Sequence, residues 1–192
     1  MWQAEGVNTL VLVGVFSSKV GQLRRFLLAG QPRRRILPQA ILRQNGRPLQ
    51  KGSAMNLLFI CASNSVRSQI AEGWARHLGG ASVGVRSAGL QPFKVHPMAV
   101  KTMKEVGVDI AHQTCRRLDD HLIQWADLAV ILSENIEPFD TIFPKELRRD
   151  HWSIPNPDAL VTDEFSQDQA YGQIRDTIKL RVERLLRTVR KP

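Results

Sequence analysis

Residues 55–68 read MNLLFICASNSVRS, and this stretch decides the fold. It opens with a continuous apolar run, typical of a parallel strand that is buried on both faces. The run ends in a cysteine, passes through small polar residues, and meets an arginine and a serine where a helical pattern begins. A strand that turns tightly into a helix directs backbone N–H groups and a helix N-terminus toward one point. Such a turn is suited to binding an anion.

The rest of residues 55–192 alternates between strand and helix patterns. The stretch 69–78 has apolar residues four positions apart, and two glycines end it. Further strands are predicted over 82–89, 127–133 and 149–154, and further helices over 96–107, 118–126 and 167–190. Strands separated by crossover helices predict a doubly wound α/β fold, here a four-stranded parallel sheet with flanking helices. Ligands of such sheets bind beyond the carboxyl ends of the strands, where Cys61 falls.

Residues 1–54 do not read as part of this fold. Nine of the chain's 27 Lys and Arg residues lie here beside a single acid, so this segment holds +8 of the total charge of +9. Proline and glycine interrupt it repeatedly. We expect residues 1–54 to form a basic, irregular and disordered N-terminal extension, and residues 55–192 to form the domain. The extension is a wrongly assigned start ahead of Met55, an organellar transit peptide, or a functional arm.

Composition excludes several classes of function. Outside the extension, 18 basic and 17 acidic residues nearly balance, so the domain lacks the basic character of a nucleic-acid-binding protein. No run of about 18 apolar residues predicts a membrane span. Two cysteines are too few for a disulfide scaffold, which indicates a cytoplasmic protein, or an organellar one if the extension is a transit peptide. The five histidines show no metal-ligand spacing, so we expect neither a metal nor a bound cofactor.

The segment from Cys61 to Ser68 carries the chemistry that we expect. Its inward-turned backbone N–H groups and the planar guanidinium of Arg67 suit a tetrahedral oxyanion. A cysteine at a helix N-terminus beside an arginine is typically ionised near neutral pH, so Cys61 is expected to be a nucleophilic thiolate. Ser68 is placed to donate a hydrogen bond to its sulfur, and Asn64 tolerates the left-handed conformation of a tight loop. The expected oxyanion-binding residues are Ala62, Ser63, Asn64, Ser65, Val66 and Arg67.

A simpler reading makes Cys61 a buried structural thiol and Arg67 a surface charge. The surrounding pattern favours the oxyanion site, because a strand precedes the loop, a helix follows it, and a second serine follows the arginine. Glu72, one turn into the helix, is either a support for Arg67 or the loop, or a residue of the helix surface.

The stretch CASNSVRSQIAEGWAR resembles the phosphate loop of the low-molecular-weight protein tyrosine phosphatases. It is still more similar to the arsenate reductases of the same fold, whose loop typically runs C-x-G-N-S-C-R-S-Q-M-A-E-G. The similarity continues through RSAGL, HPMAVKTMKEVGVDIAHQT, ADLAVIL and RRDHW, and covers nearly all of residues 55–190. The resemblance implies that Cys61 is the nucleophile and Arg67 the oxyanion clamp. It also implies that Ser68 stabilises the thiolate and that Asn64 holds the loop's shape.

Three positions depart from the family pattern. Val66 replaces the second cysteine of the loop, Ser133 stands where a redox cysteine is expected, and Asn156 replaces the acid that protonates a leaving group. Cys115, the remaining thiol, lies outside the family's redox positions. A reductase that forms an internal disulfide needs a resolving thiol. The resemblance therefore implies an arsenate reductase regenerated by an external thiol: glutathione with glutaredoxin, mycothiol or thioredoxin.

The missing acid separates the candidate substrates. Expelling a phenolate without a general acid loses about 10²–10⁴-fold in rate, whereas the leaving oxygen of arsenate already carries protons near neutral pH. Asp158 or Asp163 is the candidate acid if the loop folds differently, with Asn156 a supporting residue. The expected ligand is thus a small oxyanion such as arsenate or phosphate, and a redox partner is expected. The alternatives are a weak tyrosine phosphatase acting on phosphotyrosine, and a non-catalytic oxyanion sensor.

Overall fold

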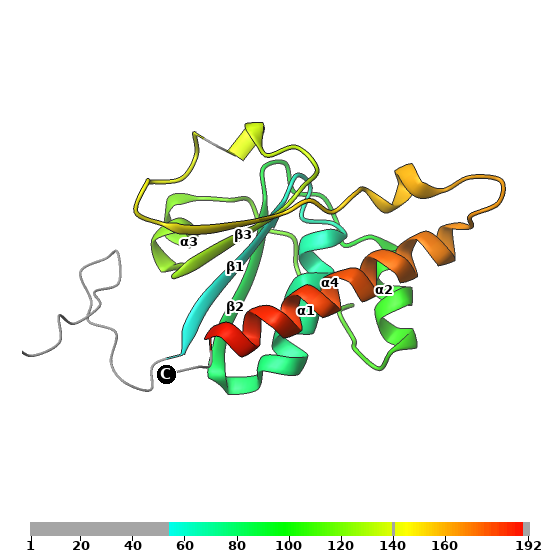
Figure 1. Ribbon diagram of the computed structural model, residues 1–192, viewed down its shortest axis with the longest axis horizontal. Coiled ribbons are helices and arrows are strands. Elements are labelled where there is room, and N and C mark those ends of the chain that lie inside the picture. Colours follow the sequence, from blue (N-terminus) through cyan, green and yellow to red (C-terminus); the bar gives the residue numbers. More distant parts are fainter. Residues whose placement is uncertain (1–53, 140, 190–192) are drawn as a thin grey trace, which may run out of the picture. The chain divides into compact units, whose positions relative to one another are not determined.

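The computed structural model describes residues 54–139 and 141–189, which contain a four-stranded parallel sheet of order β2-β1-β3-β4 (Figure 1). The strands are β1 (Met55–Cys61), β2 (Val83–Gly89), β3 (Leu128–Leu132) and β4 (Arg148–Trp152). The helices are α1 (Arg67–Gly79), α2 (Pro97–Glu105), α3 (Asp120–Trp125) and α4 (Gln167–Val189). Three short 3-10 helices are η1 (Gly80–Ser82), η2 (Glu137–Phe139) and η3 (Pro157–Leu160). The predicted doubly wound fold is confirmed; the expectations for residues 1–54 lie, apart from Ala54, outside the described residues.

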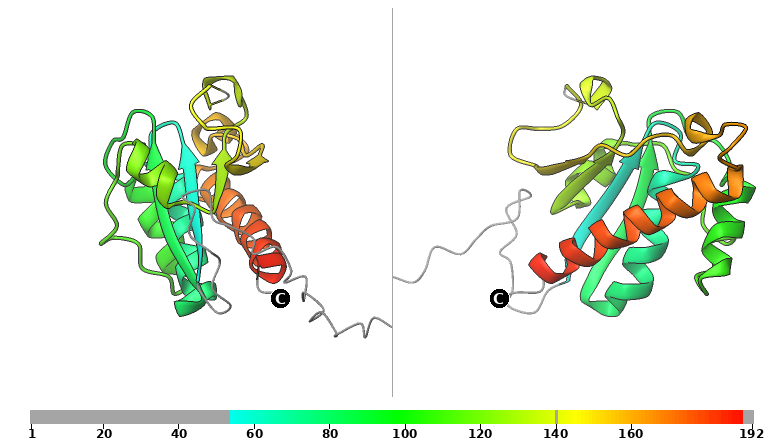
Figure 2. Two further views of the ribbon diagram at one scale, coloured as in Figure 1. Left: turned by 90° about the vertical axis from the view of Figure 1, so that its left-hand side faces the viewer. Right: turned by 45° about the vertical axis from the view of Figure 1, so that its right-hand side comes forward.

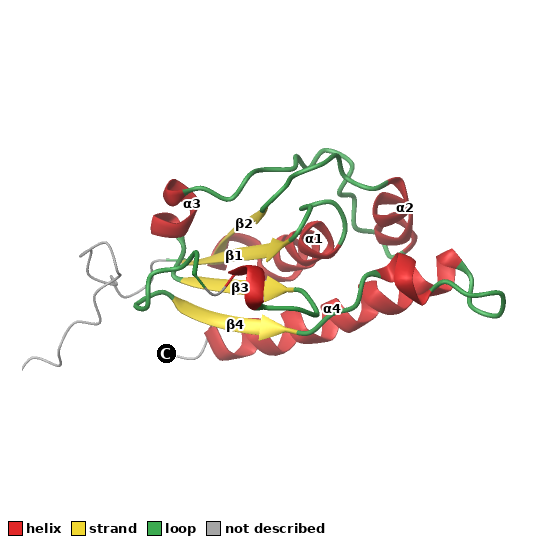
Figure 3. Ribbon diagram, turned by 90° about the horizontal axis from the view of Figure 1, so that it is seen from above, coloured by secondary structure: helices red, strands yellow, loops and turns green. Residues whose placement is uncertain are grey.

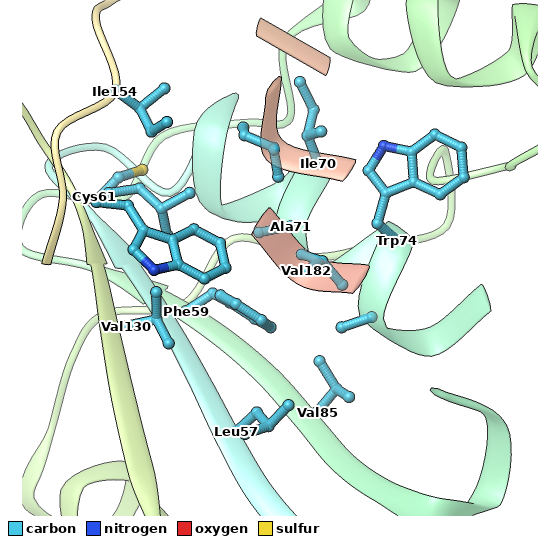
Figure 4. Close-up of a cluster of buried hydrophobic side chains, with 14 of the residues drawn as sticks. Leu57, Phe59, Cys61, Ile70, Ala71, Trp74, Val85, Val130, Ile154 and Val182 are labelled. Carbon is cyan, nitrogen blue, oxygen red and sulfur yellow. The ribbon is translucent and has the colours of Figure 1, made fainter. Parts of the chain in front are cut away.

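The helices cover both faces of the sheet. Helices α1 and α4 lie side by side on one face with α2 beyond them, and α3 covers the other face (Figures 2 and 3). The larger buried cluster fills the face that carries α1 and α4. In Figure 4, Cys61 and Ile154 lie at one end of this cluster, and Leu57 and Val85 lie at the other. The nucleophile expected from the sequence is therefore at the margin of the main core.

Strand β1 explains the continuous apolar run of the sequence. It pairs with β2 from Met55 opposite Val83 to Cys61 opposite Gly89, and with β3 on its other side. Both of its faces are covered, so its side chains from 57 to 60 are fully buried. The chain leaves β1 for β2 on one side and enters β3 on the other, which makes the carboxyl end of β1 the switch point where such sheets bind ligands.

Local residue choices set the helix ends. The side chain of His96 accepts a hydrogen bond from the second residue of α2, and Asp119 caps α3 in the same manner. Gly80 after α1 and Gly107 after α2 have φ values of 54° and 77°, which glycine adopts without steric cost. These stops agree with the helix ends expected from the sequence.

Helix α4 buries its apolar residues in the larger cluster, beside α1 and α2. The side chain of Arg175 on the same helix is only 13% exposed and pairs with Glu105 and Asp176. Its Nη1 also donates to the carbonyl of Thr102 on α2, so the arginine joins the two helices. None of the helices in residues 54–139 and 141–189 is both long and apolar enough to cross a membrane.

Candidate functional site

The loop between β1 and α1 turns its carbonyl groups outward. Those of Ala62, Ser63 and Ser65 accept hydrogen bonds from backbone N–H groups of the segment 91–96, at 3.0 Å each. Within the described part of the chain, no acceptor meets the backbone N–H groups of residues 63–66. Outward carbonyls and free N–H groups form the concave arrangement that binds anions, and the N-terminus of α1 adds its positive end.

Asn64 holds the shape of this loop. Its φ of 49° is the one positive value among the described non-glycine residues, and its side chain is fully buried. Its Nδ2 donates to Ser68 Oγ and to Ser87 Oγ, at 2.8 Å each, while its Oδ1 accepts from the backbone N–H of Arg116 at 2.8 Å. Three bonds in three directions fix the side chain, and they supply the partners that offset the cost of the left-handed backbone.

Gly89, the last residue of β2, lets the sheet approach the loop. A Cβ atom at this position would lie 2.6 Å from the backbone nitrogen of Asn64 and 2.9 Å from the carbonyl oxygen of Ala62. Both of these atoms belong to the backbone, so neither can move without moving the loop. Only glycine allows the end of β2 to pack directly behind the anion-binding turn.

A chain of hydrogen bonds runs from Glu72 to the sulfur of Cys61. Ser87 Oγ donates to Glu72 Oε2, because a carboxylate can only accept. Ser87 is then free to accept from Asn64, whose second amide hydrogen goes to Ser68. Ser68 Oγ lies 3.0 Å from Cys61 Sγ, and its own hydrogen remains available for the sulfur. Asn64 thus donates in two directions, toward Ser87 and Glu72 on one side and toward Ser68 on the other, and the bond to Ser68 leaves the Ser68 hydrogen for the sulfur of Cys61.

Glu72 is an anchor of this network and not a surface residue. Its side chain is 1% exposed, and its Oε1 accepts from Arg76 at 2.6 Å, with Arg116 Nη1 4.0 Å away. The interpretation as a helix-surface glutamate is therefore wrong, because the first turns of α1 face the end of β2 and bury this carboxylate. No hydrogen bond joins Glu72 to Arg67 among the described residues, so Glu72 acts on the loop through Ser87.

Arg67 begins α1 at the mouth of the loop. Its side chain is half-buried, and its Nη1 donates to the carbonyl of Ile154 at 2.8 Å. This bond fixes one side of the guanidinium against the segment that follows β4. The remaining N–H groups of the fork have no acceptor among the described residues, which leaves them for an oxyanion.

The candidate acids lie on the segment after β4. Asn156 is exposed, and its side chain forms no hydrogen bond with a described residue. Asp158 is also exposed, and its Oδ1 accepts from the hydroxyl of Tyr171 at 2.9 Å. Burial, and then the bond to Asp158, raise the pKa of Tyr171. His96, whose Nδ1 lies 3.2 Å from the Tyr171 hydroxyl, also donates its backbone N–H to the loop. Asp158 is thus linked to the loop through two side chains.

Cys115 contacts the loop, and no local pattern in the sequence indicates this contact. Its Sγ donates to the carbonyl of Asn64 at 2.9 Å, and Gln69 Nε2 lies 3.7 Å from the sulfur. Burial raises the pKa of Cys115, and the nearby Cys61 raises it further. The second cysteine of the chain is therefore held as a neutral thiol behind the anion-binding turn.

In the described residues, no group of three or more His, Cys, Asp or Glu side chains could hold a metal ion. Asp163, the other candidate acid of the sequence, is exposed, and its side chain has no hydrogen bond to a described residue. The described site thus consists of the loop, Arg67 and the network behind them.

Known proteins are similar to this chain in sequence and in architecture. The sequence model for low molecular weight phosphotyrosine protein phosphatase matches residues 56–192. An arsenate reductase of Staphylococcus xylosus is 37% identical over 127 residues, which are 66% of this chain and 92% of that protein. A solved arsenate reductase in the phosphate binding state has a TM-score of 0.62 and 30% identity, and the match covers 70% of this chain and 98% of the other. The solved thioredoxin-dependent arsenate reductase of Corynebacterium glutamicum has a TM-score of 0.58 and 26% identity, and the match covers 73% of this chain and 64% of the other.

Proposed function

The chain belongs to the low molecular weight phosphotyrosine protein phosphatase family, and on this premise we propose that it is an arsenate reductase with Cys61 as its nucleophile. The observation that carries the proposal is the bond between Ser68 Oγ and Cys61 Sγ, held in place by Asn64 and lying below a turn of free N–H groups. A sulfur that accepts a hydrogen bond beneath such a turn is placed to attack a bound tetrahedral oxyanion.

Arsenate is the favoured substrate for two reasons. The relatives described above are named arsenate reductases. Asn156 occupies the position of the family's acid and cannot transfer a proton, while arsenate brings protons on its own oxygens. The absence of the acid therefore slows arsenate reduction less than it slows a reaction that must release a phenolate.

The chemistry proceeds in two steps. The Cys61 thiolate attacks the arsenic of bound arsenate, and a protonated oxygen leaves as water or hydroxide, forming a sulfur–arsenic bond. Arg67 and the backbone N–H groups hold the remaining oxygens and the charge that they carry. An external thiolate then attacks Cys61 Sγ, the electrons of the sulfur–arsenic bond remain on arsenic, and arsenite leaves. A second equivalent of thiol reduces the mixed disulfide and restores Cys61.

The reducing thiol comes from outside the chain. By the resemblance to the arsenate reductases, Val66 and Ser133 occupy positions where those proteins carry further cysteines. Cys115 is held as a neutral thiol by its surroundings, so it is a poor attacking group. Thioredoxin, glutathione with glutaredoxin, and mycothiol are the candidate reductants. A cytoplasmic location, which supplies such thiols, stays a prediction.

Parallel assays test this proposal. Purified protein is incubated with arsenate and each of the three thiol systems, and arsenite formation is measured for the wild type, Cys61→Ser and Cys115→Ser. We expect at least one system to support turnover, Cys61→Ser to abolish it, and Cys115→Ser to retain it. Loss of turnover in Cys115→Ser, with phosphate still protecting Cys61 from alkylation, would instead assign the resolving thiol to the chain itself. Oxyanion binding without turnover in any system would indicate a sensor.

A weak tyrosine phosphatase is the second candidate, and the position of Asp158 favours it. The carboxylate is held by Tyr171, next to His96, which donates its backbone N–H to Ser65. If Asp158 supplies the proton, hydrolysis of an aryl phosphate will fall by about 10²-fold or more in Asp158→Asn. Equal hydrolysis in Asp163→Asn, an exposed carboxylate nearby in sequence, provides the matched control.

A further inference from the structure

A hollow lies between the edge strand β4 and the C-terminal part of α4, and β4 is two strands away from the Cys61 strand β1. Its volume is about 780 Å³, within the range of small-molecule sites. It is lined by all of β4, by Leu128 of β3, and by Arg181, Arg184, Leu185 and Thr188 of α4. Alternate side chains of a strand point to opposite faces, so a hollow that touches all five residues of β4 runs along the open edge of the sheet.

The hollow concentrates positive charge. Arg148 and Arg149 line it from the strand, and Arg181 and Arg184 line it from the helix. None of the ion pairs within the described residues involves these four arginines. The single acidic lining residue is Asp150, whose Oδ2 accepts from the indole N–H of Trp152 at 2.8 Å. Four arginines thus line one surface depression with one acidic residue.

The residue types indicate what would neutralise this charge. All four basic side chains are arginines, whose planar forks bind phosphate oxygens in pairs and stay charged at any physiological pH. Because they lie on two opposing walls, one anion between strand and helix can contact both. Leu128 and Leu185 contribute an apolar part to the lining, which a purely inorganic anion would not use.

The hollow is separate from the oxyanion loop. Arg148 pairs with Leu128, which pairs with Leu57, and Leu57 precedes Cys61 by four residues along β1. At about 3.3 Å per residue, the start of β4 is displaced by about 13 Å along the strand direction from the level of the nucleophile. The other end of the hollow reaches the level of Cys61, because His151 pairs with Ile131 and Ile131 pairs with Ile60, but β3 lies between β4 and β1. A ligand bound at the arginines therefore does not need the Cys61 loop.

We propose that this hollow binds a multiply phosphorylated organic anion, with the arginines of β4 and α4 on its phosphates and the two leucines against its organic part. The near-neutral net charge of the domain does not reveal such a site, because the acids that balance the arginines lie elsewhere in the fold. This site is independent of arsenate reduction, so its test uses binding as the readout.

Calorimetric titrations of the full chain with ATP and with inorganic tripolyphosphate, both in metal-free buffer, test the proposal. The variant Arg148→Ala/Arg184→Ala removes one guanidinium from each wall. Arg187→Ala/Lys145→Ala removes the same charge from exposed residues that do not line the hollow. Protection of Cys61 from alkylation by inorganic phosphate verifies that each variant keeps an intact loop.

We expect ATP to bind at least about tenfold more weakly to Arg148→Ala/Arg184→Ala, because each charge-assisted contact is strong, and to bind the control variant like the wild type. ATP should also bind more tightly than tripolyphosphate, because only ATP has an organic part for the leucines to contact. Leu185→Ala should therefore reduce the difference in affinity between ATP and tripolyphosphate. An equal loss of ATP affinity in both double variants would overturn the proposal, since the loss would then follow from the change in net charge and not from the hollow. Tighter binding of an oligoglutamate peptide than of either phosphate compound would also overturn it, and would assign the hollow to an acidic protein segment.

Discussion

Replacing Asn64 with alanine tests the whole account of the loop. The substitution removes three side-chain hydrogen bonds, to Ser68, Ser87 and the backbone of Arg116. At about 1 kcal/mol for each net bond, their loss costs about 3 kcal/mol. Alanine at a φ of 49° adds about 1–2 kcal/mol of backbone strain. We therefore expect Asn64→Ala to lower the free energy of unfolding by about 4–5 kcal/mol, measured by urea titration with tryptophan fluorescence.

Asn64→Gly separates the two contributions. Glycine loses the same three bonds but adopts positive φ without strain, at a backbone entropy cost of about 0.5–1 kcal/mol. We expect it to be more stable than the alanine variant by about 1 kcal/mol or less, and both variants to show slower alkylation of Cys61, because Ser68 loses the donor that orients it. An alanine variant that loses less than about 1 kcal/mol, or that equals wild type in Cys61 alkylation, would refute this reasoning.

Four further measurements probe the residues around the loop. Gly89→Ala should lower stability by about 1–3 kcal/mol, because its Cβ would lie 2.6 Å from the nitrogen of Asn64; an unchanged urea midpoint would contradict the close approach. Glu72→Gln should slow alkylation of Cys61 more than Arg76→Ala does, because only the former alters the carboxylate that accepts from Ser87 and holds Ser87 beside Asn64; equal alkylation rates would contradict that role. Alkylation of Cys115, followed by mass spectrometry, should stay slow at pH 8 and rise only above its ordinary pKa of 9.0, because burial and Cys61 raise that pKa. Tyr171 has a raised pKa, so its contribution to stability is fully present below pH 10.0 and declines above it. The urea midpoint should therefore fall less between pH 8 and pH 11 in Tyr171→Phe than in the wild type.

Much of the fold follows from local patterns in the sequence. The apolar run of β1, the four-residue spacing in α1 and the glycines at 80 and 107 each encode one element or its end. The loop was predictable for the same reason, since its chemistry is contained in eight consecutive residues. Strand order was not predicted, because it depends on which strands pair in three dimensions.

The support of the loop could not be predicted. Gly89, Ser87 and Cys115 reach it from segments that share no pattern with it, and a single glycine or serine carries no local signature of a long-range contact. Glu72 illustrates the ambiguity: a glutamate one turn into a helix reads equally well as exposed or buried. The arginine hollow was hidden in the same way, since its two walls come from residues about 30 positions apart.

The loop's carbonyl partners have a consequence for the order in which the protein matures. Cys115 and Arg116 follow Asn64 by 51 and 52 positions, and the segment 91–96 also lies beyond β2. A nascent chain that has just completed its first strand and helix thus possesses the sulfur and the guanidinium but no receptor for an oxyanion. Reactivity of the nucleophile should emerge only after synthesis has continued from the end of α1 at Gly79 to Arg116, so a chain truncated between these two residues is inert even where β1 and α1 are folded.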